Sequence, residues 1–208
     1  MRAAGLLLLA LLPSGLEAQR IRSGNRIDSS EFPKATLDVA PGMVYAGTQR
    51  FDLYGVADAE QHFFVELDGT RIKRLLWIQY EGYHPANNST YNYRDETVEH
   101  SGRTWFRSAR AVRVPDTEPR PDSDGAHTRA FLRAKGWTMG PDLMLERLVW
   151  TLDAPARHEL MVIYMEDLAG QGFIAADLND GGKAHDRWPA LAEAFHQRAV
   201  AAFSVKDR

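Results

Sequence analysis

Aromatic and amide side chains gather in one short stretch of the sequence, between positions 80 and 93. The members that could contact a ligand are Tyr80, Tyr83, His84, Tyr91 and Tyr93. Aromatic faces bind sugars or planar molecules by stacking, while neighbouring amides and hydroxyls supply hydrogen bonds. The segment therefore predicts a binding surface for a small molecule, with a carbohydrate as one option. Because tyrosine is also common in strands for packing reasons alone, an ordinary sheet edge is the alternative.

A second group of candidate binding residues follows at alternating positions. Arg103, Trp105 and Arg107 would share one side of a regular strand, because strand side chains alternate between the two faces. Two guanidinium groups around an indole could hold an anionic group, and we expect this trio to lie near the tyrosine segment. The alternative is that the arginines pair with the abundant aspartate and glutamate side chains, as is usual on a half-exposed strand.

The histidines offer a different chemistry, that of a hydrolase. It would use His84, His100 or His158 with Glu166 or Asp167 in a cleft, with a histidine in hydrogen-bond reach of a carboxylate. No catalytic residue can be named from the sequence beyond this alternative.

Metal and cofactor sites have little support in the sequence. None of the seven histidines has the spacing of a known metal motif. The acidic loop over residues 177–182 departs from a calcium-binding loop, because Gly181 occupies a ligand position and Trp188 replaces the final glutamate. We therefore expect no metal site and no cofactor.

The N-terminus predicts export. Arg2 precedes an apolar run over residues 5–12, which is followed by Pro13, Ser14, Gly15 and a small residue at Ala18; this order is typical of a secretory signal peptide over residues 1–18. The run is too short to cross a bilayer as a helix. We expect cleavage after Ala18 and a periplasmic or secreted location.

Composition narrows the function classes. A net charge of −3 in 208 residues gives no basic excess, which argues against a nucleic-acid partner. No cysteine is present, so thiol nucleophiles, thiolate zinc sites and disulfides are excluded, and packing alone must hold the fold. A small molecule, a carbohydrate or an envelope protein remains the expected partner, and no transmembrane segment is predicted.

Alternating apolar residues predict most of the secondary structure. Asp68-Gly69, between two apolar runs, is typical of a tight hairpin turn. A helix is expected between Ser123 and Gly136, and a last helix opens at Trp188 and carries Phe195 and Phe203 on its apolar face. The expected strands cover residues 51–54, 62–67, 70–83, 91–99, 103–114, 143–152 and 158–165.

These elements predict an α+β fold, with an antiparallel sheet of about six strands covered by two helices, one of them C-terminal. Residues 19–42 are expected to form an extended lead-in, and residues 43–208 a single domain. The leading functional hypothesis is a non-enzymatic ligand-binding or interaction protein. The alternatives are the hydrolase-type enzyme above and a structural or assembly protein of the cell envelope, which would show a broad apolar patch.

Overall fold

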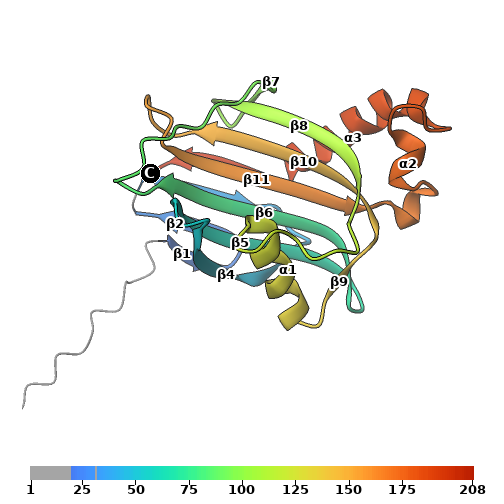
Figure 1. Ribbon diagram of the computed structural model, residues 1–208, viewed down its shortest axis with the longest axis horizontal. Helices are drawn as coiled ribbons and strands as arrows, with labels where there is room; N and C mark the ends of the chain where they lie inside the picture. Colours follow the sequence, from blue (N-terminus) through green and yellow to red (C-terminus); the bar gives the residue numbers. More distant parts are fainter. Residues whose placement is uncertain (1–19, 31) are drawn as a thin grey trace, which may run out of the picture.

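Two β-sheets dominate the structure (Figure 1). The computed structural model describes residues 20–30 and 32–208, so the predicted signal peptide lies outside the described residues. Within the described part of the chain, no helix is long and apolar enough to cross a membrane.

The large sheet has eight strands. Along its main path they are β4 (Val44–Leu53), β5 (Ala57–Asp68), β6 (Arg71–Tyr83), β11 (His158–Asp167), β10 (Asp142–Thr151), β8 (Arg103–Arg113) and β7 (Glu96–His100), in that spatial order. Each neighbouring pair on this path is antiparallel. The short strand β9 (Thr138–Met139) adds a parallel pairing to β6. The predicted hairpin at Asp68-Gly69 is confirmed, because it joins β5 to β6.

The small sheet has four strands and joins the two ends of the described chain. In spatial order they are β1 (Arg20–Ser23), β2 (Arg26–Ser29), β3 (Ala35–Val39) and β12 (Phe203–Asp207). The segment expected to be an extended lead-in thus supplies three strands. Phe203, which the helical spacing placed in the last helix, is instead the first residue of β12.

In the described part of the chain, three α-helices and two short 3-10 turns complete the fold. They are α1 (Asp124–Ala134), η1 (Leu168–Gln171), α2 (Ala175–Leu178), η2 (His185–Arg187) and α3 (Trp188–Ala201). The predicted start of α1 is confirmed, because the Ser123 hydroxyl accepts a hydrogen bond of 3.0 Å from the Ala126 amide. Gly136, with φ of +73°, follows the end of this helix and takes the left-handed conformation that glycine tolerates.

The predicted six-stranded α+β fold is wrong. The chain is mostly β, with a four-stranded and an eight-stranded sheet and few helical residues. The additional strands are short and lie in segments with weak alternation, broken by Gly24, Pro33 and Pro41. Their strand conformation depends on pairing partners far away in the sequence, as β3 pairs with β12, and a local pattern does not contain that information.

The two faces of the large sheet are covered differently. On β6, Leu76, Ile78 and Tyr80 point to the back face and pack with residues of the small sheet and α3, including Phe195. Leu75 and Trp77 point to the front face, where the cover comes from α1 through Leu132 and Phe131. The alternation of side chains along β6 produces this division, except at Ile72. A register shift between Glu66 and Leu67 turns Ile72 to the front face.

Figure 1 shows the consequence for the shape of the molecule, with the small sheet behind the large one and α1 crossing the front of β5 and β6. The helices α2 and α3 lie at the end near β8 and β10. The back face is therefore covered by the small sheet and α3, and the front face only in part.

A matched pair of valine variants tests which face forms the core. Val162, on the back face of β11, is 1% exposed, whereas Val44 on edge strand β4 is 68% exposed. We expect Val162→Ala to lower the free energy of unfolding by about 2 kcal/mol, because it removes buried methyl groups and leaves a cavity. Val44→Ala should change it by less than about 0.5 kcal/mol. Urea denaturation measures both values, and equal losses would contradict the assignment of the core.

Candidate functional site

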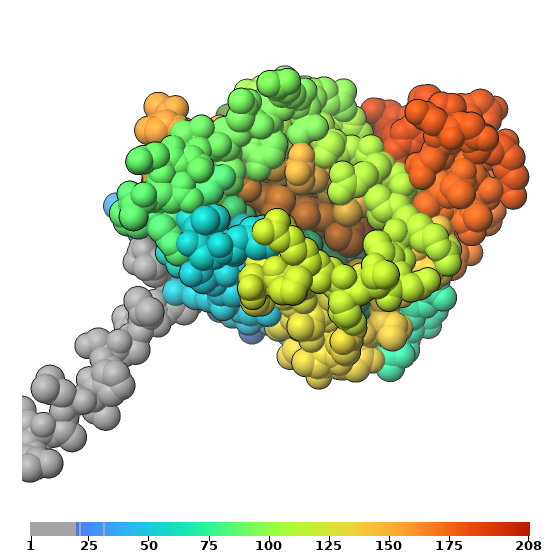
Figure 2. Space-filling model, viewed as in Figure 1, coloured from blue at the N-terminus to red at the C-terminus, as the bar shows by residue number. Residues whose placement is uncertain are grey.

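The front of the molecule is hollowed (Figure 2). The floor of the hollow carries the orange-brown colours of β10 and β11. Its rim is formed by the segment leading from β6 to β8, by the region just before and within α1, and by the turn between β4 and β5. The hollow therefore lies over the part of the front face that α1 leaves uncovered.

The floor of the hollow is mostly apolar. The apolar front-facing side chains of the two floor strands are Leu143, Leu145, Val149, Met161, Ile163 and Met165, and all belong to one packed cluster with Trp77 and Phe106. Arg147 on β10, which pairs with Ile163, also faces the front. Several keep a small exposed area, with Leu145 at 9% and Ile163 at 7%. Such a floor can bind the apolar part of a ligand with little loss of side-chain freedom.

Two carboxylates stand side by side at one end of this face. Glu81 on β6 pairs directly with Glu159 on β11 in the sheet register. Side chains at directly opposed positions have Cβ atoms about 5 Å apart, and like charges there repel. Glu159 is 2% exposed, so water screens this repulsion poorly.

Tyrosines from the connection between β6 and β7 cover the carboxylate pair. The Tyr91 hydroxyl donates a hydrogen bond of 2.6 Å to Glu81 Oε1, and the Tyr93 hydroxyl donates to Glu159 Oε2. The rings form a stack, with centroids 4.5 Å apart between Tyr83 and Tyr91 and 6.5 Å apart between Tyr91 and Tyr93. Burial, followed by the nearby glutamate charges, raises the pKa of both Tyr91 and Tyr93, so both remain hydrogen-bond donors at neutral pH.

A chain of glutamines fixes the orientation of Glu81. Gln61 Nε2 donates to Gln79 Oε1 at 2.7 Å, and Gln79 Nε2 donates to Glu81 Oε2 at 2.6 Å. Trp77 Nε1 adds a third donor to this chain, at 3.1 Å from Gln79 Oε1. Because both glutamines are fully buried, the network holds Glu81 at a defined place rather than leaving it mobile.

The electrostatics of the pair disfavour two negative charges. Burial, followed by the charge of Glu81, raises the pKa of Glu159 to about 8, against an ordinary value of 4.5. Burial also raises the pKa of Glu81, although hydrogen bonds from Tyr91 and Gln79 oppose the shift. The site therefore holds a proton at neutral pH that ordinary carboxylates would have lost.

Glu159 differs from the other buried carboxylates. Among residues 20–30 and 32–208 these are Glu60, Asp142, Glu146, Glu159, Glu166 and Asp177. The other five form ion pairs with Arg20, Arg113, Arg107, Arg198 and Lys183, respectively. Glu159 forms no such pair in this part of the chain. It is a buried acid whose charge the described protein does not balance with a bound cation.

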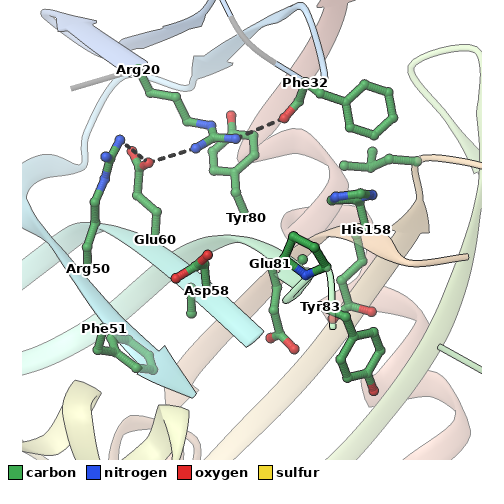
Figure 3. A pocket seen from close by; sticks show the side chains of 15 residues that line it. Arg20, Phe32, Arg50, Phe51, Asp58, Glu60, Tyr80, Glu81, Tyr83 and His158 are labelled. Carbon is green, nitrogen blue, oxygen red and sulfur yellow. Dashed lines mark hydrogen bonds and ion pairs between the residues drawn. The ribbon is translucent and has the colours of Figure 1, made fainter. Parts of the chain in front are cut away.

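Glu60 shows the contrast on the back face. Figure 3 shows Arg20 and Arg50 both bound to its carboxylate, each at 2.7 Å. His62 Nε2 lies 2.6 Å from the other carboxylate oxygen. Burial alone would raise the pKa of Glu60, but the hydrogen bond from His62 and the charge of Arg20 outweigh it and lower the pKa to about 2.

A cavity of about 640 Å³ lies where β5 begins and β6 ends. Its lining includes Glu81, Glu159 and Tyr83 from the front face of the strands. Tyr80 and Glu60 line it from the back face, and Figure 3 shows them on the other side of the strands from Glu81. Glu81 and Glu159 therefore belong to the lining of this cavity, which includes none of the residues of the apolar floor.

Two further polar atoms of the front face lack hydrogen bonds within the described chain. They are Arg147 Nε and Ser108 Oγ, on residues that pair across β10 and β8. The Arg147 guanidinium bonds Asp95 at 2.9 Å and lies 5.2 Å from the centre of the Tyr93 ring. These atoms add hydrogen-bonding capacity beside the tyrosine stack.

The structure divides the candidate binding residues between the two faces. It brings Tyr83, Tyr91 and Tyr93 together in the front hollow. Tyr80 points to the back face beneath Arg20, with the guanidinium carbon 3.8 Å from its ring centre. His84 is only partly buried, and its Nε2 lies 3.5 Å from Asp58 Oδ1.

The second predicted group lies on the back face and so does not join the tyrosines. Trp105 is fully buried in the back-face core. Arg103 binds Asp207, and Arg107 binds Glu96 and Glu146, which matches the alternative of arginines paired with acids. The sequence interpretation placed both groups on one surface because it had no means of assigning the face of each strand.

The histidines of the hydrolase alternative are also apart from its acids. His158 Nδ1 lies 3.2 Å from Asp153 Oδ2, and His100 Nε2 lies 3.1 Å from the Phe203 carbonyl oxygen. Glu166 is bound by Arg198, and Asp167 by Arg71. Within residues 20–30 and 32–208, no group of three or more histidine or acidic side chains is arranged to hold a metal ion.

Glu81, Glu159, Gln61 and Gln79 were absent from the predicted site. Their signal was present, because Gln79 and Glu81 continue the front-facing positions of β6, and Glu159 opens the otherwise apolar run of β11. Polar residues at the end of a buried strand face are the feature that could have indicated them. Comparisons with protein-family models, curated proteins and solved structures find no match to this chain, so its function has to be argued from this geometry.

The raised pKa of Glu159 predicts a pH dependence of stability. The native protein keeps this proton up to about pH 8, whereas the unfolded chain loses it near 4.5. The native state therefore binds more protons in this window, and the free energy of unfolding falls as pH rises through it. For one full proton the slope is about 1.4 kcal/mol per pH unit.

We expect Glu159→Gln to remove this part of the slope, since the amide has no proton to lose and can still accept the Tyr93 hydrogen bond. Urea denaturation across this pH window measures the effect. Glu99→Gln, at an exposed position on β7, is the matched control and should run parallel to the wild type. Parallel curves for Glu159→Gln and the wild type would show that Glu159 titrates normally.

Proposed function

We propose that this protein binds a small molecule in the front hollow and does so without chemical conversion. The observation that carries the proposal is a partly open sheet face with an apolar floor and, at one end, a buried acid that the described chain leaves without a basic partner. An ordinary sheet face would be either covered by another layer or polar throughout. Here the uncovered part of the front face combines an apolar floor with a few fixed polar groups, as ligand-binding sites do.

The tyrosine stack supports the same proposal. The rings of Tyr83, Tyr91 and Tyr93 offer flat surfaces at the rim, and two of their hydroxyls are already used to orient the carboxylates. A ligand on the floor would therefore meet aromatic faces and fixed polar groups together. This part of the predicted binding surface is the part that the proposal keeps.

The other hypotheses receive less support. A hydrolase built on Glu166 or Asp167 would need a histidine beside them, and arginines bind these acids instead. An assembly protein would need a broad apolar patch, but the exposed large hydrophobic residues of the described chain occupy separate places, at Phe32, Val44, Tyr54 and Ile174. An exported location, periplasmic or secreted, rests on residues 1–18 and remains part of the proposal.

The hollow can be tested with a neutral apolar dye, N-phenyl-1-naphthylamine, whose fluorescence rises when it leaves water. We expect binding to the wild type. Ile163→Phe should weaken it at least tenfold, because the larger ring fills the floor from its centre. Ile174→Phe, at an exposed site at the start of α2, is the matched control and should bind like the wild type.

Circular dichroism would verify that both variants fold. Absence of dye binding to the wild type, or equal binding by Ile163→Phe, would contradict the proposed site.

A further inference from the structure

We propose that the ligand of the front hollow is an organic cation with an apolar body, whose ammonium group is bound by Glu81 and Glu159 beside the stacked tyrosines. The inference rests on the proposed function and adds the chemical class of the ligand. Three features of the described chain carry it: the unpaired buried acid, the aromatic stack, and the position of Glu81, Glu159 and Tyr83 at the edge of a cavity.

The first feature is the missing counter-charge. Every other buried carboxylate of the described chain is bound by a lysine or arginine. Glu159 is equally buried, and Tyr93 is the one side chain of residues 20–30 and 32–208 that donates a hydrogen bond to its carboxyl group. A buried acid is stable as an anion only with a compensating positive charge. Because no lysine or arginine of the described chain forms an ion pair with Glu159, a cationic ligand can supply that charge.

The second feature is the tyrosine stack. Aromatic ring faces attract ammonium groups because the ring quadrupole is negative above its plane. Tyr91 and Tyr93 lie nearly parallel, at 7° between planes, and their hydroxyls reach the two glutamates. Tyr91 lies between the rings of Tyr83 and Tyr93, and Arg147 lies over Tyr93, so Tyr83 at the end of the stack is the ring whose face a cation at the carboxylates would meet. Two carboxylates beside this ring select against an anionic ligand.

The third feature is access. Glu81, Glu159 and Tyr83 all line the cavity of about 640 Å³ at the strand ends. From Glu159, the front-facing side chains along β11 are Met161 and Ile163, which belong to the apolar floor. A molecule with its charged end at the carboxylates can thus lay an apolar body along the floor.

Each element packed against Glu159 contributes a charged or titratable group to its surroundings. Glu81 lies on β6, Tyr91 and Tyr93 on the following connection, Arg147 on β10 and Asp124 at the start of α1. Arg147 favours the ionised form of Glu159, but it forms its ion pair with Asp95. Glu81 and Asp124 oppose ionisation, so the pair needs an external cation to become fully charged.

The test is a series of ligands that share an n-octyl chain and differ only in the head group. Octyltrimethylammonium and octylamine are the cations, 1-octanol is the neutral member and octanoate is the anion. Isothermal titration calorimetry on the purified chain at pH 9, where Glu159 is ionised, gives each Kd. We expect both cations to bind at least tenfold tighter than octanol, and octanoate to bind more weakly than octanol.

The proton released on binding is a second, independent measure of the interaction between the cation and Glu159. At pH 7, binding of octyltrimethylammonium should release close to one proton, because the cation drives Glu159 to ionise. Repeating the titration in buffers of different ionisation enthalpy measures that proton. In Glu159→Gln the cation preference and the proton release should both disappear, while octanol binding is kept. Glu99→Gln should retain the wild-type pattern.

The outcomes separate the two proposals. Equal affinity for the cations and octanol, or tighter binding of octanoate, overturns the cation inference and leaves the binding hollow intact. Failure of all four ligands to bind overturns the proposed function as well. The four affinities of the wild-type protein test both proposals even if the Glu159→Gln variant does not fold.

Discussion

The register between β6 and β11 is the constraint on which the site depends. It places Glu81 directly opposite Glu159 on the front face, at a position where water is largely excluded. A shift of β11 by one residue would turn Glu159 to the back face and into the apolar core. The hairpin at Asp68-Gly69 and the long pairing of β5, β6 and β11 fix this register, so the repulsion between the two acids is built into the sheet.

The two faces of the large sheet have different roles, one in stability and one in the candidate site, because different elements cover them. On the back face the small sheet and α3 complete the core, and buried acids such as Glu60 and Glu146 are matched with arginines and histidines. On the front face one helix covers part of the apolar surface and leaves a hollow (Figure 2). The back face stabilises the fold, and the front face holds a buried acid without a basic partner in the described chain, which stability alone does not require.

Much of the large sheet was predictable from the sequence, because period-two alternation is strong in β6 and the Asp68-Gly69 turn is specific. The small sheet was not, because β1, β2 and β12 are short and gain their stability from partners distant in the chain. Within the site, Tyr83, Tyr91 and Tyr93 were predicted, but their partners Glu81 and Glu159 were not. Two residues 78 positions apart become neighbours only through the pairing of β6 with β11, which composition and local spacing do not reveal.

The most direct measurement is a pH titration of the glutamate side-chain carboxyls by ¹³C NMR, with Glu159→Gln used to assign the signal. The account predicts one glutamate of the wild type that titrates with an apparent pKa of about 8, coupled to Glu81, and that loses this behaviour when octyltrimethylammonium is bound. If every glutamate of the free protein titrated near 4.5, the two acids would not share a buried, uncompensated site, and the central claim would be contradicted.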